Sequence, residues 1–397
     1  MERILMIGIG WEQIPMVKKA KEKGLYVIAT TWWDQDRIPA DKIYTVDSSN
    51  LSELEKIYLK EKPQYIIADE CDYSMYAVAY LTDKYNLPGP SLRVQAITNN
   101  KYLQRESLSN TDVLQPKYRL CWNIDMAKKF AIEVEYPIVI KPVDNRGSIG
   151  VSKVYSEREI EEAWFLAITN TPSHMCIVEK CINGDVITAD GFCDSDGYEF
   201  ISPSNKDMYD NNSNLAKVVY YPGKFSAKLF QKIKLNAEKI VDSIGIKFGF
   251  VHIEFIIEKE TEEVYLVEVA NRGGGVYTSN IVLKNITGID YCEKLIDLAM
   301  GKNVYAKCNQ NYINKSIIYF LELSGNSFIT SFKKENNCDA LFINKKRLDA
   351  DTAKEAAIGR HGVSIWNGND FESMIQEARE VEKIYTQSEE EYFWLKE

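Results

Sequence analysis

Two glutamates on neighbouring apolar segments carry the clearest chemical signal. Residues 250–257 and 264–269 read as strands joined by a short polar run. If this turn centres on Thr261, Glu254 and Glu268 lie directly opposite each other on one face of the hairpin. Opposed carboxylates repel unless they are protonated, paired with a base or bridged by a cation. The pattern predicts a Mg²⁺ site, because Mg²⁺ prefers oxygen ligands and commonly joins carboxylates to phosphates. The alternative is a solvated sheet face.

Three polar residues accompany this pair. His252 shares the face of Glu254, two positions earlier in the predicted strand. Asn271 and Arg272 follow Glu268 closely. They offer another oxygen ligand and a permanent cation for an anionic intermediate.

A lysine and a glycine-containing loop form a second constellation. Residues 136–142 read as a short apolar strand that delivers Lys141, and residues 143–151 follow as a loop. The backbone of this loop, with Gly147 and the Ser148 hydroxyl, is suited to close over phosphates. Without the lysine, the same loop is an ordinary hairpin turn.

Two further segments have the geometry to meet a ligand through their backbone. The strand predicted at 174–181 runs into Ile182, and extended backbone at such a junction can meet the edge of an adenine ring. Gly8 and Gly10 lie between a strand and a helix, where N–H groups can meet an anion. A dinucleotide fingerprint needs a third glycine where this chain has Gln13, which disfavours a nicotinamide cofactor. The turn either contacts substrate or only closes a βα unit.

The elements that position these residues fall into three stretches. The first ninety residues alternate strand and helix, which predicts a parallel sheet covered by helices, and residues 87–90 (Leu-Pro-Gly-Pro) mark a boundary. Residues 94–300 predict an α+β region of strands joined by hairpins. The last hundred residues contain strand-like segments at 316–321 and 340–343, a helix-like run at 371–382 and an acidic tail.

Composition excludes several classes of protein. Of 397 residues, 45% are hydrophobic and 27% are charged, as in folded globular domains, and the formal net charge of −10 disfavours nucleic acid and anionic membranes as partners. No apolar run approaches the roughly 20 residues needed to span a bilayer. The eight scattered cysteines and three histidines predict neither a disulfide framework nor a zinc site, and favour a reduced cytoplasm.

Taken in order, these motifs resemble the ATP-grasp superfamily. The resemblance rests on Gly8 and Gly10, Asn100-Lys101 before Arg105, Ile140-Lys141-Pro142 with its loop, Val178-Glu179, Glu254, and the run from Glu268 to Arg272. It implies a Rossmann-like pre-ATP-grasp domain at 1–92 and a two-part grasp at 93–300 with a lid at about 115–182. A C-terminal α+β region at 301–397 would complete the grasp.

The resemblance also assigns roles to residues. It implies nucleotide contacts from Lys101, Lys141, Gly147, Ser148, Glu179, Lys180, Cys181, Ile182 and Asp185, metal ligation by Glu254, Glu268 and Asn271, and catalytic roles for Arg272, Lys141 and Glu268. Two positions depart from the usual pattern. Ala270 stands at the usual asparagine position, which puts ligation by Asn271 in doubt. Val186 replaces a common acidic residue, so that Asp185 becomes the candidate for the ribose.

The implied activity is a Mg-ATP-dependent ligase, with Mn²⁺ as an alternative metal, that activates a small carboxylate as an acyl phosphate and couples it to an amine. The run from Glu268 to Gly275 is similar to a branch that includes amino-acid ligases and phosphoribosylglycinamide synthetase relatives. Substrate candidates by position are Glu12, Gln13, Asp190, Lys206, Tyr220, His252, Gly273 and Gly274; for Lys206, an exposed lysine in a polar loop is the simpler interpretation. Carboxylation, formyl transfer and a non-catalytic nucleotide-binding regulator are alternatives, and the resemblance also allows a homodimer.

Overall fold

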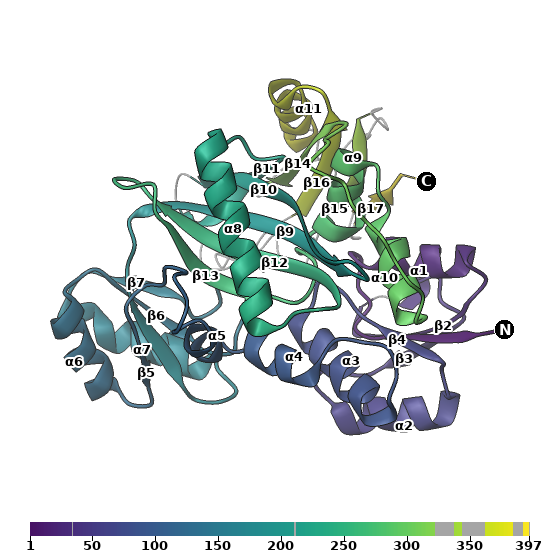
Figure 1. Ribbon diagram of the computed structural model, residues 1–397, viewed down its shortest axis with the longest axis horizontal. Helices are drawn as coiled ribbons and strands as arrows, with labels where there is room; N and C mark the ends of the chain where they lie inside the picture. Colours follow the sequence, from purple (N-terminus) through teal and green to yellow (C-terminus); the bar gives the residue numbers. More distant parts are fainter. Residues whose placement is uncertain (34, 210–211, 322–336, 344–361, 384–391, 397) are drawn as a thin grey trace.

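The strands of this protein form three sheets (Figure 1). The computed structural model describes residues 1–33, 35–209, 212–321, 337–343, 362–383 and 392–396. The first sheet is parallel and lies at the N-terminus, the second forms a separate lobe, and the third runs through the centre of the molecule. The candidate residues of the sequence lie on or beside all three sheets.

The N-terminal sheet has the strand order β3-β2-β1-β4 and is parallel throughout. Its strands are β1 (Arg3–Met6), β2 (Tyr26–Thr31), β3 (Lys42–Thr45) and β4 (Tyr65–Ile67), accompanied by α1 (Ile14–Glu22), η1 (Gln35–Arg37), α2 (Leu51–Glu61) and α3 (Asp72–Tyr85). Because β2 and β4 flank β1 on opposite sides, the strand order reverses at β1. Ligands of such sheets bind in the crevice at the carboxyl ends of the strands beside this reversal.

The second sheet belongs to the lobe at the lower left of Figure 1. It has the antiparallel order β5-β8-β6-β7, with β5 (Tyr118–Cys121), β6 (Ile138–Pro142), β7 (Ser152–Val154) and β8 (Cys176–Lys180). The helices of the lobe are α6 (Ile124–Val134), η2 (Glu157–Glu159) and α7 (Ile160–Thr169). Phe130, Ile140 and Trp164 belong to a hydrophobic core confined to this lobe. A lobe with its own core is suited to move as a unit.

The central sheet has nine strands in the order β13-β12-β9-β10-β11-β14-β16-β15-β17. They are β9 (Gly184–Asp194), β10 (Gly197–Tyr209), β11 (Asn212–Tyr221), β12 (Gly249–Glu258), β13 (Val264–Ala270), β14 (Lys315–Leu321), β15 (Cys338–Ile343), β16 (Gly362–Gly368) and β17 (Tyr392–Leu395). The last four come from the C-terminal hundred residues, so that region extends the central sheet.

Helices cover the central sheet and connect it to the other two. They are α4 (Leu92–Thr98), α5 (Lys101–Ser107), α8 (Ala227–Ile244), the π-helical turn η3 (Thr278–Val282), α9 (Leu283–Thr287), α10 (Tyr291–Ala299) and α11 (Phe371–Lys383). Helix α8 lies across the sheet in Figure 1. Ser226 caps its start, and Gly245 ends it in the left-handed conformation that favours glycine. Ile233 and Ile240 on its buried face pack into the core beneath it.

One hydrophobic core joins the N-terminal sheet to the central sheet. Met6 of β1, Phe192 of β9 and Ile365 of β16 all belong to it. These two parts therefore form a single packed body, and the lobe of β5 to β8 is attached to it. None of the described helices is long and apolar enough to cross a membrane.

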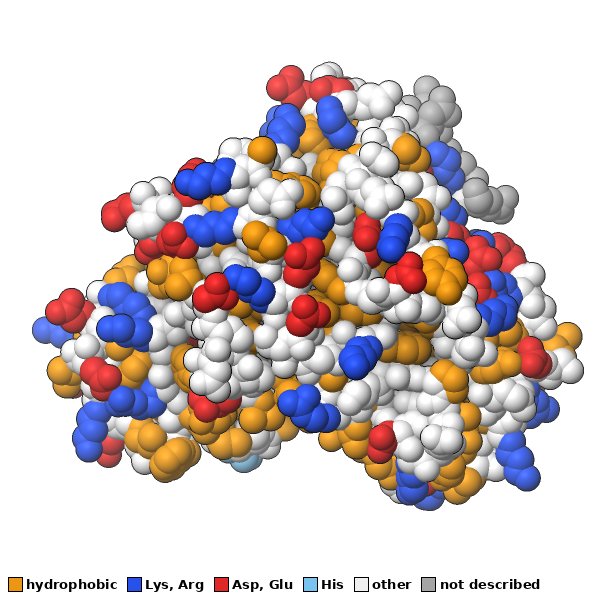
Figure 2. Space-filling view, in the orientation of Figure 1, with side chains coloured by type: hydrophobic (Ala, Val, Ile, Leu, Met, Phe, Trp, Pro, Cys, Tyr) orange, Lys and Arg blue, Asp and Glu red, His pale blue; other side chains and the backbone are white. Residues whose placement is uncertain are grey.

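Charged side chains of both signs are interspersed over the face shown in Figure 2. The described residues present no continuous basic area on this face.

The strands and helices predicted around the candidate residues are confirmed within one or two residues at their ends, including β12 and β13 around the two glutamates. Strand β17, which follows the predicted acidic stretch, was not predicted. The rest of the predicted acidic tail, at residues 384–391 and 397, lies outside the described residues.

Candidate active site

Glu254 and Glu268 are cross-strand partners on β12 and β13, as the hairpin pattern predicts. Each carboxylate also meets a lysine ammonium group. Lys206 Nζ lies 2.9 Å from Glu254 Oε1, and Lys101 Nζ lies 2.9 Å from Glu268 Oε2. Pairing with bases is one of the three ways to relieve the repulsion between the carboxylates, and the two lysines provide it.

The lysines keep both carboxylates ionised. Burial is the largest single effect on Glu254 and pushes its pKa up, but the charge and hydrogen bond of Lys206 and the nearby His252 together hold the pKa below its ordinary value. Burial is also the largest single effect on Glu268, but Lys101, Arg272 and Lys141 together lower its pKa to about 2. Two charged carboxylates are therefore ready to accept a cation at neutral pH.

A buried trio of charges lies next to this pair. Lys141 Nζ of β6 is 2.8 Å from Glu179 Oε2 of β8, and Arg105 Nη2 of α5 is 2.9 Å from Glu179 Oε1. Burial lowers the pKa of Lys141, although Glu179 opposes this effect. Burial would raise the pKa of Glu179, but Arg105 and Lys141 together hold the pKa below its ordinary value.

A pocket opens beside Lys101 and Glu268. It is lined by Asp72, Tyr73, Thr98, Asn99, Lys101, Asp144, Asn145, Arg146, Glu268, Val269 and Ala270. The lining comes from the N-terminal domain, from α4 and α5, from the loop after β6 and from β13. Lys101 Nζ also donates to the carbonyl of Asn145 at 2.7 Å, which holds that loop against α5.

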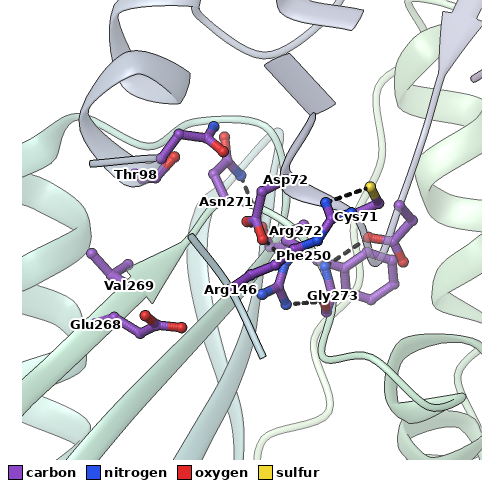
Figure 3. Close-up of polar contacts among 12 residues, drawn as sticks. Cys71, Asp72, Thr98, Arg146, Phe250, Glu268, Val269, Asn271, Arg272 and Gly273 are labelled. Atoms are coloured by element: carbon purple, nitrogen blue, oxygen red, sulfur yellow. Dashed lines mark hydrogen bonds and ion pairs between the residues drawn. The ribbon is translucent and has the colours of Figure 1, made fainter. Parts of the chain in front are cut away.

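Arg272 lies just beyond β13 at the edge of this region (Figure 3). Its Nε donates to Asp72 Oδ1 at 2.9 Å, and its Nη1 donates to the carbonyl of Gly273 at 2.9 Å. Burial tends to lower the pKa of Arg272, but the carboxylate of Asp72 raises it above its ordinary value. Arg146 lies nearby, with its Nη1 3.0 Å from Cys71 Sγ (Figure 3).

Three carboxylates gather at the carboxyl ends of β1 and β4; Asp69 and Glu70 are buried and Glu12 is partly buried. Glu12 accepts the Val276 amide proton at 2.8 Å, and Asp69 accepts the Gly273 amide proton at 2.6 Å. Glu70 accepts from the hydroxyl of Ser279 at 2.8 Å. Burial raises the pKa of all three, and for Glu70 the charges of Glu12 and Asp69 raise it further. Asp69 and Glu12 thereby tie the two ends of the glycine run of residues 273–275 to the N-terminal sheet.

We expect a Glu70→Gln substitution to stabilise the protein at about pH 8. A carboxyl whose pKa is raised by folding favours the native state at low pH, and this contribution is lost as the pH rises through the folded pKa. Removing the ionisable group should raise the melting temperature by about 2 °C or more near pH 8. Thermal unfolding at about pH 8 and about pH 4 tests this, with the exposed Glu22→Gln as control. The gain should shrink at the lower pH; destabilisation at the higher pH would contradict the assignment.

Comparison with known proteins identifies the part of the chain that carries this site. Residues 134–280, which hold Lys141, Glu179, Glu254, Glu268 and Arg272, match the family model of the ATP-grasp domain. The chain contains an ATP-grasp domain. The resemblance inferred from its motifs is confirmed.

Similarity to known proteins extends beyond this domain over most of the chain. A formate-dependent phosphoribosylglycinamide formyltransferase of Prochlorococcus marinus is 25% identical over 292 residues, which are 72% of this chain and 74% of the relative. A solved phosphoribosylglycinamide synthetase from Anaerococcus prevotii has a TM-score of 0.75 and 20% identity, covering 100% of both chains. An L-amino acid ligase from Bacillus licheniformis has a TM-score of 0.76 and 16% identity, covering 100% of this chain and 99% of the other. The predicted ATP-grasp fold is confirmed.

The contacts of Asn271 differ from its predicted role as a metal ligand. Its amide nitrogen donates to the carbonyls of Phe248 and Phe250, both at 2.8 Å, and its Oδ1 accepts from Gln95 at 3.1 Å. These bonds tie the end of β13 to β12 and α4, and the side chain is buried. Among the described residues, no group of three or more His, Cys, Asp or Glu side chains is arranged to hold a metal.

The position of Tyr220 differs from its predicted role as a substrate residue. Its hydroxyl donates to Asp207, and its ring packs against Phe371 of α11, on the face of β11 that points away from the carboxylates. Its neighbour Tyr221 faces the site, because successive side chains of a strand alternate. Tyr221 donates to Asp190 Oδ2 at 2.8 Å.

Asp190 of β9, which is buried, and His252 of β12, which is partly buried, form a pair. His252 Nδ1 is 2.7 Å from Asp190 Oδ1. Gly274 lies directly above, where an added Cβ would be 2.9 Å from His252 Nδ1. The glycine therefore lets the backbone approach this pair closely. Of the predicted substrate residues, Glu12, Gln13, Asp190, His252, Gly273 and Gly274 line one region.

Lys206 was more simply interpreted as an exposed lysine in a polar loop, and this interpretation was wrong. The residue lies within β10, its side chain is 11% exposed, and it pairs with Glu254.

The remaining predicted nucleotide residues surround the end of β8. Lys180 Nζ donates to the carbonyls of Glu135 and Tyr136, and the Cys181 amide donates to Pro137 at 3.1 Å, so both join the lobe together. Ile182 follows at the exit of the strand. Asp185 is largely exposed and lies 3.6 Å from Lys259.

The predicted closing loop has the backbone of a tight turn. Gly147 and Ser148 both have positive φ, at 63° and 60°. Their contacts with a nucleotide stay predictions.

Several residues that shape the site were absent from the predicted set. They are Arg105, which had been noted only as part of a motif, and Asp69, Glu70, Asp72, Gln95, Arg146 and Tyr221. Most of them act on partners far along the chain, and a single sequence gives no signal for such pairs. The position of Asp69, Glu70 and Asp72 directly after a buried strand was the one local signal available.

We expect a Lys206→Met substitution to increase the response of the protein to Mg²⁺ alone. Without this ammonium group, Glu254 faces Glu268 with one counter-charge fewer, and Mg²⁺ no longer competes with Lys206. The metal-free variant should melt lower than the parent, and millimolar Mg²⁺ should raise its melting temperature by about 2–4 °C more than that of the parent. Lys239→Met, which removes the exposed pair with Asp112, is the control. An identical Mg²⁺ response in parent and variant would argue against a cation site at the glutamates.

Proposed function

We propose that this protein is a ligase that uses Mg-ATP to activate a small-molecule carboxylate as an acyl phosphate and couples it to an amine, releasing ADP and phosphate. The observation that carries the proposal is the opposed pair Glu254 and Glu268, ionised and bordered by Lys101, Lys141 and Arg272. Binding of a nucleotide alone does not require two facing carboxylates beside three cations.

The carboxylate pair fits a Mg²⁺ or Mn²⁺ ion that takes its other ligands from phosphates and water. Mg²⁺ is commonly held by one or two carboxylates together with substrate phosphates. The two glutamates supply these carboxylates once the ammonium groups of Lys101 and Lys206 move away from them. When bound, the ion would polarise the phosphates and neutralise part of their charge.

The residues of the chain supply the rest of the electrostatic stabilisation. Lys101 and Lys141 contact the nucleotide phosphates, and Arg272 faces the charge that develops on the transferred phosphoryl group. Closure of residues 145–150 over the pocket excludes water, which would otherwise hydrolyse the acyl phosphate. The oxygen of the substrate carboxylate attacks the γ-phosphorus and ADP departs; the amine then attacks the acyl carbon and phosphate departs.

The acid and the amine bind in the crevice between β1, β4 and the glycine run at 273–275. Glu12 and His252 lie against this run, Gln13 contacts the chain just after β4, and Asp190 pairs with His252. Its position at the carboxyl ends of parallel strands, where the strand order reverses, is the usual place for a small ligand in such a sheet.

Oxygen-18 labelling tests the acyl phosphate directly. With both carboxylate oxygens of the acid labelled, the mechanism predicts one labelled oxygen in each phosphate released. Product phosphate without label, or release of AMP and pyrophosphate, would contradict the proposed intermediate.

A second candidate is ATP-dependent formyl transfer, in which formate is the carboxylate that is activated. It is favoured by the formate-dependent phosphoribosylglycinamide formyltransferases among the relatives. ADP release that depends on formate and an amine, and that amino acids do not support, would favour this candidate over the amino-acid ligase reading.

A further inference from the structure

We propose that Arg105 is a positioning residue that neutralises Glu179, so that the charge of Lys141 stays available for nucleotide phosphates. The inference rests on the proposed nucleotide site and extends it to a residue that touches neither the pocket nor, in our assignment, the nucleotide. It concerns the buried trio of Arg105, Lys141 and Glu179 described above.

Arg105 connects two sheets from within α5. Its side chain is fully buried. Its Nε donates to Glu179 Oε1 at 3.0 Å in the lobe, and its Nη2 donates to the carbonyl of Val267 at 2.6 Å in the central sheet. Val267 precedes the candidate metal ligand Glu268. The arginine therefore fixes the lobe strand that carries Glu179 against the strand that carries Glu268.

The charges of the trio explain why the arginine matters. Glu179 lies within 3 Å of both Arg105 and Lys141. Two cations and one carboxylate together carry a net charge of +1. Without Arg105, Lys141 and Glu179 would form a neutral buried pair, and a neutral pair gives little attraction to a polyphosphate. With Arg105 present, one positive charge is left over beside the phosphate site.

Fold stability alone does not account for this arrangement. Within the described residues, Arg105 Nη1 is buried and has no hydrogen-bond partner. A buried charge with an unsatisfied donor is a poor source of stability, and apolar side chains of similar size often serve a core as well or better. A role in placing charge explains both the burial and the unsatisfied donor.

The neighbouring residues of α5 support the same interpretation. Lys101 and Arg105 are one helical turn apart and share a face of the helix. Lys101 pairs with Glu268 on the central sheet and Arg105 pairs with Glu179 on the lobe. One face of a short helix thus supplies a cation to each half of the grasp.

The test compares ligands that differ in charge. Affinities for adenosine and for ADP with Mg²⁺ are measured by calorimetry for the parent, for Arg105→Met and for the double variant Arg105→Met with Glu179→Gln. Arg119→Gln removes an exposed arginine of the lobe that pairs with Glu133 and serves as control. Thermal unfolding confirms that each variant is folded.

We expect Arg105→Met to weaken ADP binding about tenfold or more, the size of one charge-assisted interaction, while adenosine binding stays within about threefold. The double variant restores the net charge to +1 and should recover most of the ADP affinity. A purely structural role predicts instead equal losses for adenosine and ADP, and no recovery in the double variant.

Each of the remaining outcomes also supports or overturns the proposed role of Arg105. Parent-like ADP binding in Arg105→Met overturns the proposal. If only the single variant fails to fold, the double variant is compared with the parent, and an ADP affinity within about tenfold supports the proposal whereas a larger loss overturns it. If neither variant folds, Arg105 is structural and the proposal fails. A parent that binds no ADP would overturn the proposed function itself, which separates that failure from the failure of this inference.

Discussion

Replacing Glu268 with Gln should lower the rate of ADP formation by about a thousandfold or more. The substitution keeps the shape of the side chain but removes one of two charges that would hold the cation. It also removes the partner of Lys101, whose Nζ lies 2.9 Å from the Glu268 carboxylate. Both changes reduce the electrostatic stabilisation of the transferred phosphoryl group. The rate is measured by coupled ADP detection, with the substrate pair that supports turnover in the parent.

A matched control separates this effect from the general loss of a carboxylate. Glu260 is exposed in the turn of the same hairpin, and Glu260→Gln should retain the activity of the parent. Raising the Mg²⁺ concentration should recover part of the activity of Glu268→Gln and leave Glu260→Gln unchanged. If Glu268→Gln turns over within tenfold of the parent at low Mg²⁺, the glutamate pair is not the metal site.

Replacing Arg272 with Gln should lower kcat by about 10²–10³-fold, the range observed when one preorganised donor to a developing anion is removed. Asp72 and the Gly273 carbonyl hold the guanidinium in place, so its orientation is fixed before the substrate binds. Because its charge is needed most in the transition state, the KM for ATP should change much less than kcat.

Arg272→Lys and Arg93→Gln complete this experiment. The lysine keeps the charge but cannot reproduce the planar fork, so an intermediate loss is expected. Arg93 donates to the Ile244 carbonyl and provides an exposed arginine outside the site. A loss that appears only in KM, or equal losses in Arg272→Gln and Arg93→Gln, would show that Arg272 does not stabilise the transition state.

The sequence was most informative where chemistry coincides with local periodicity. Glu254 and Glu268 were predicted as partners because an apolar hairpin fixes which side chains face each other, and the register between β12 and β13 confirms this. The position of Lys141 at the end of an apolar strand was predicted for the same reason.

Local patterns failed where a choice depended on contacts across the fold. Tyr220 and Tyr221 are adjacent tyrosines on β11, and only the pairing of that strand decides which one faces Asp190. Asn271 looked like an oxygen ligand, but Gln95, 176 residues away, occupies its Oδ1. Arg105 meets Glu179 over a separation of 74 residues, which no spacing within one sequence reveals. The proposed domain boundaries and the nucleotide contacts stay predictions.

The central claim is that this protein forms an acyl phosphate from ATP and a carboxylate and passes the acyl group to an amine. Its most direct test is the release of ADP and phosphate from Mg-ATP with amino acids and other small carboxylates, singly and in pairs with amines, with Glu268→Gln as the blank. We predict ADP and phosphate with a defined pair, and neither in the blank. AMP and pyrophosphate, or no turnover with any pair while Mg-ATP still binds, would contradict the claim.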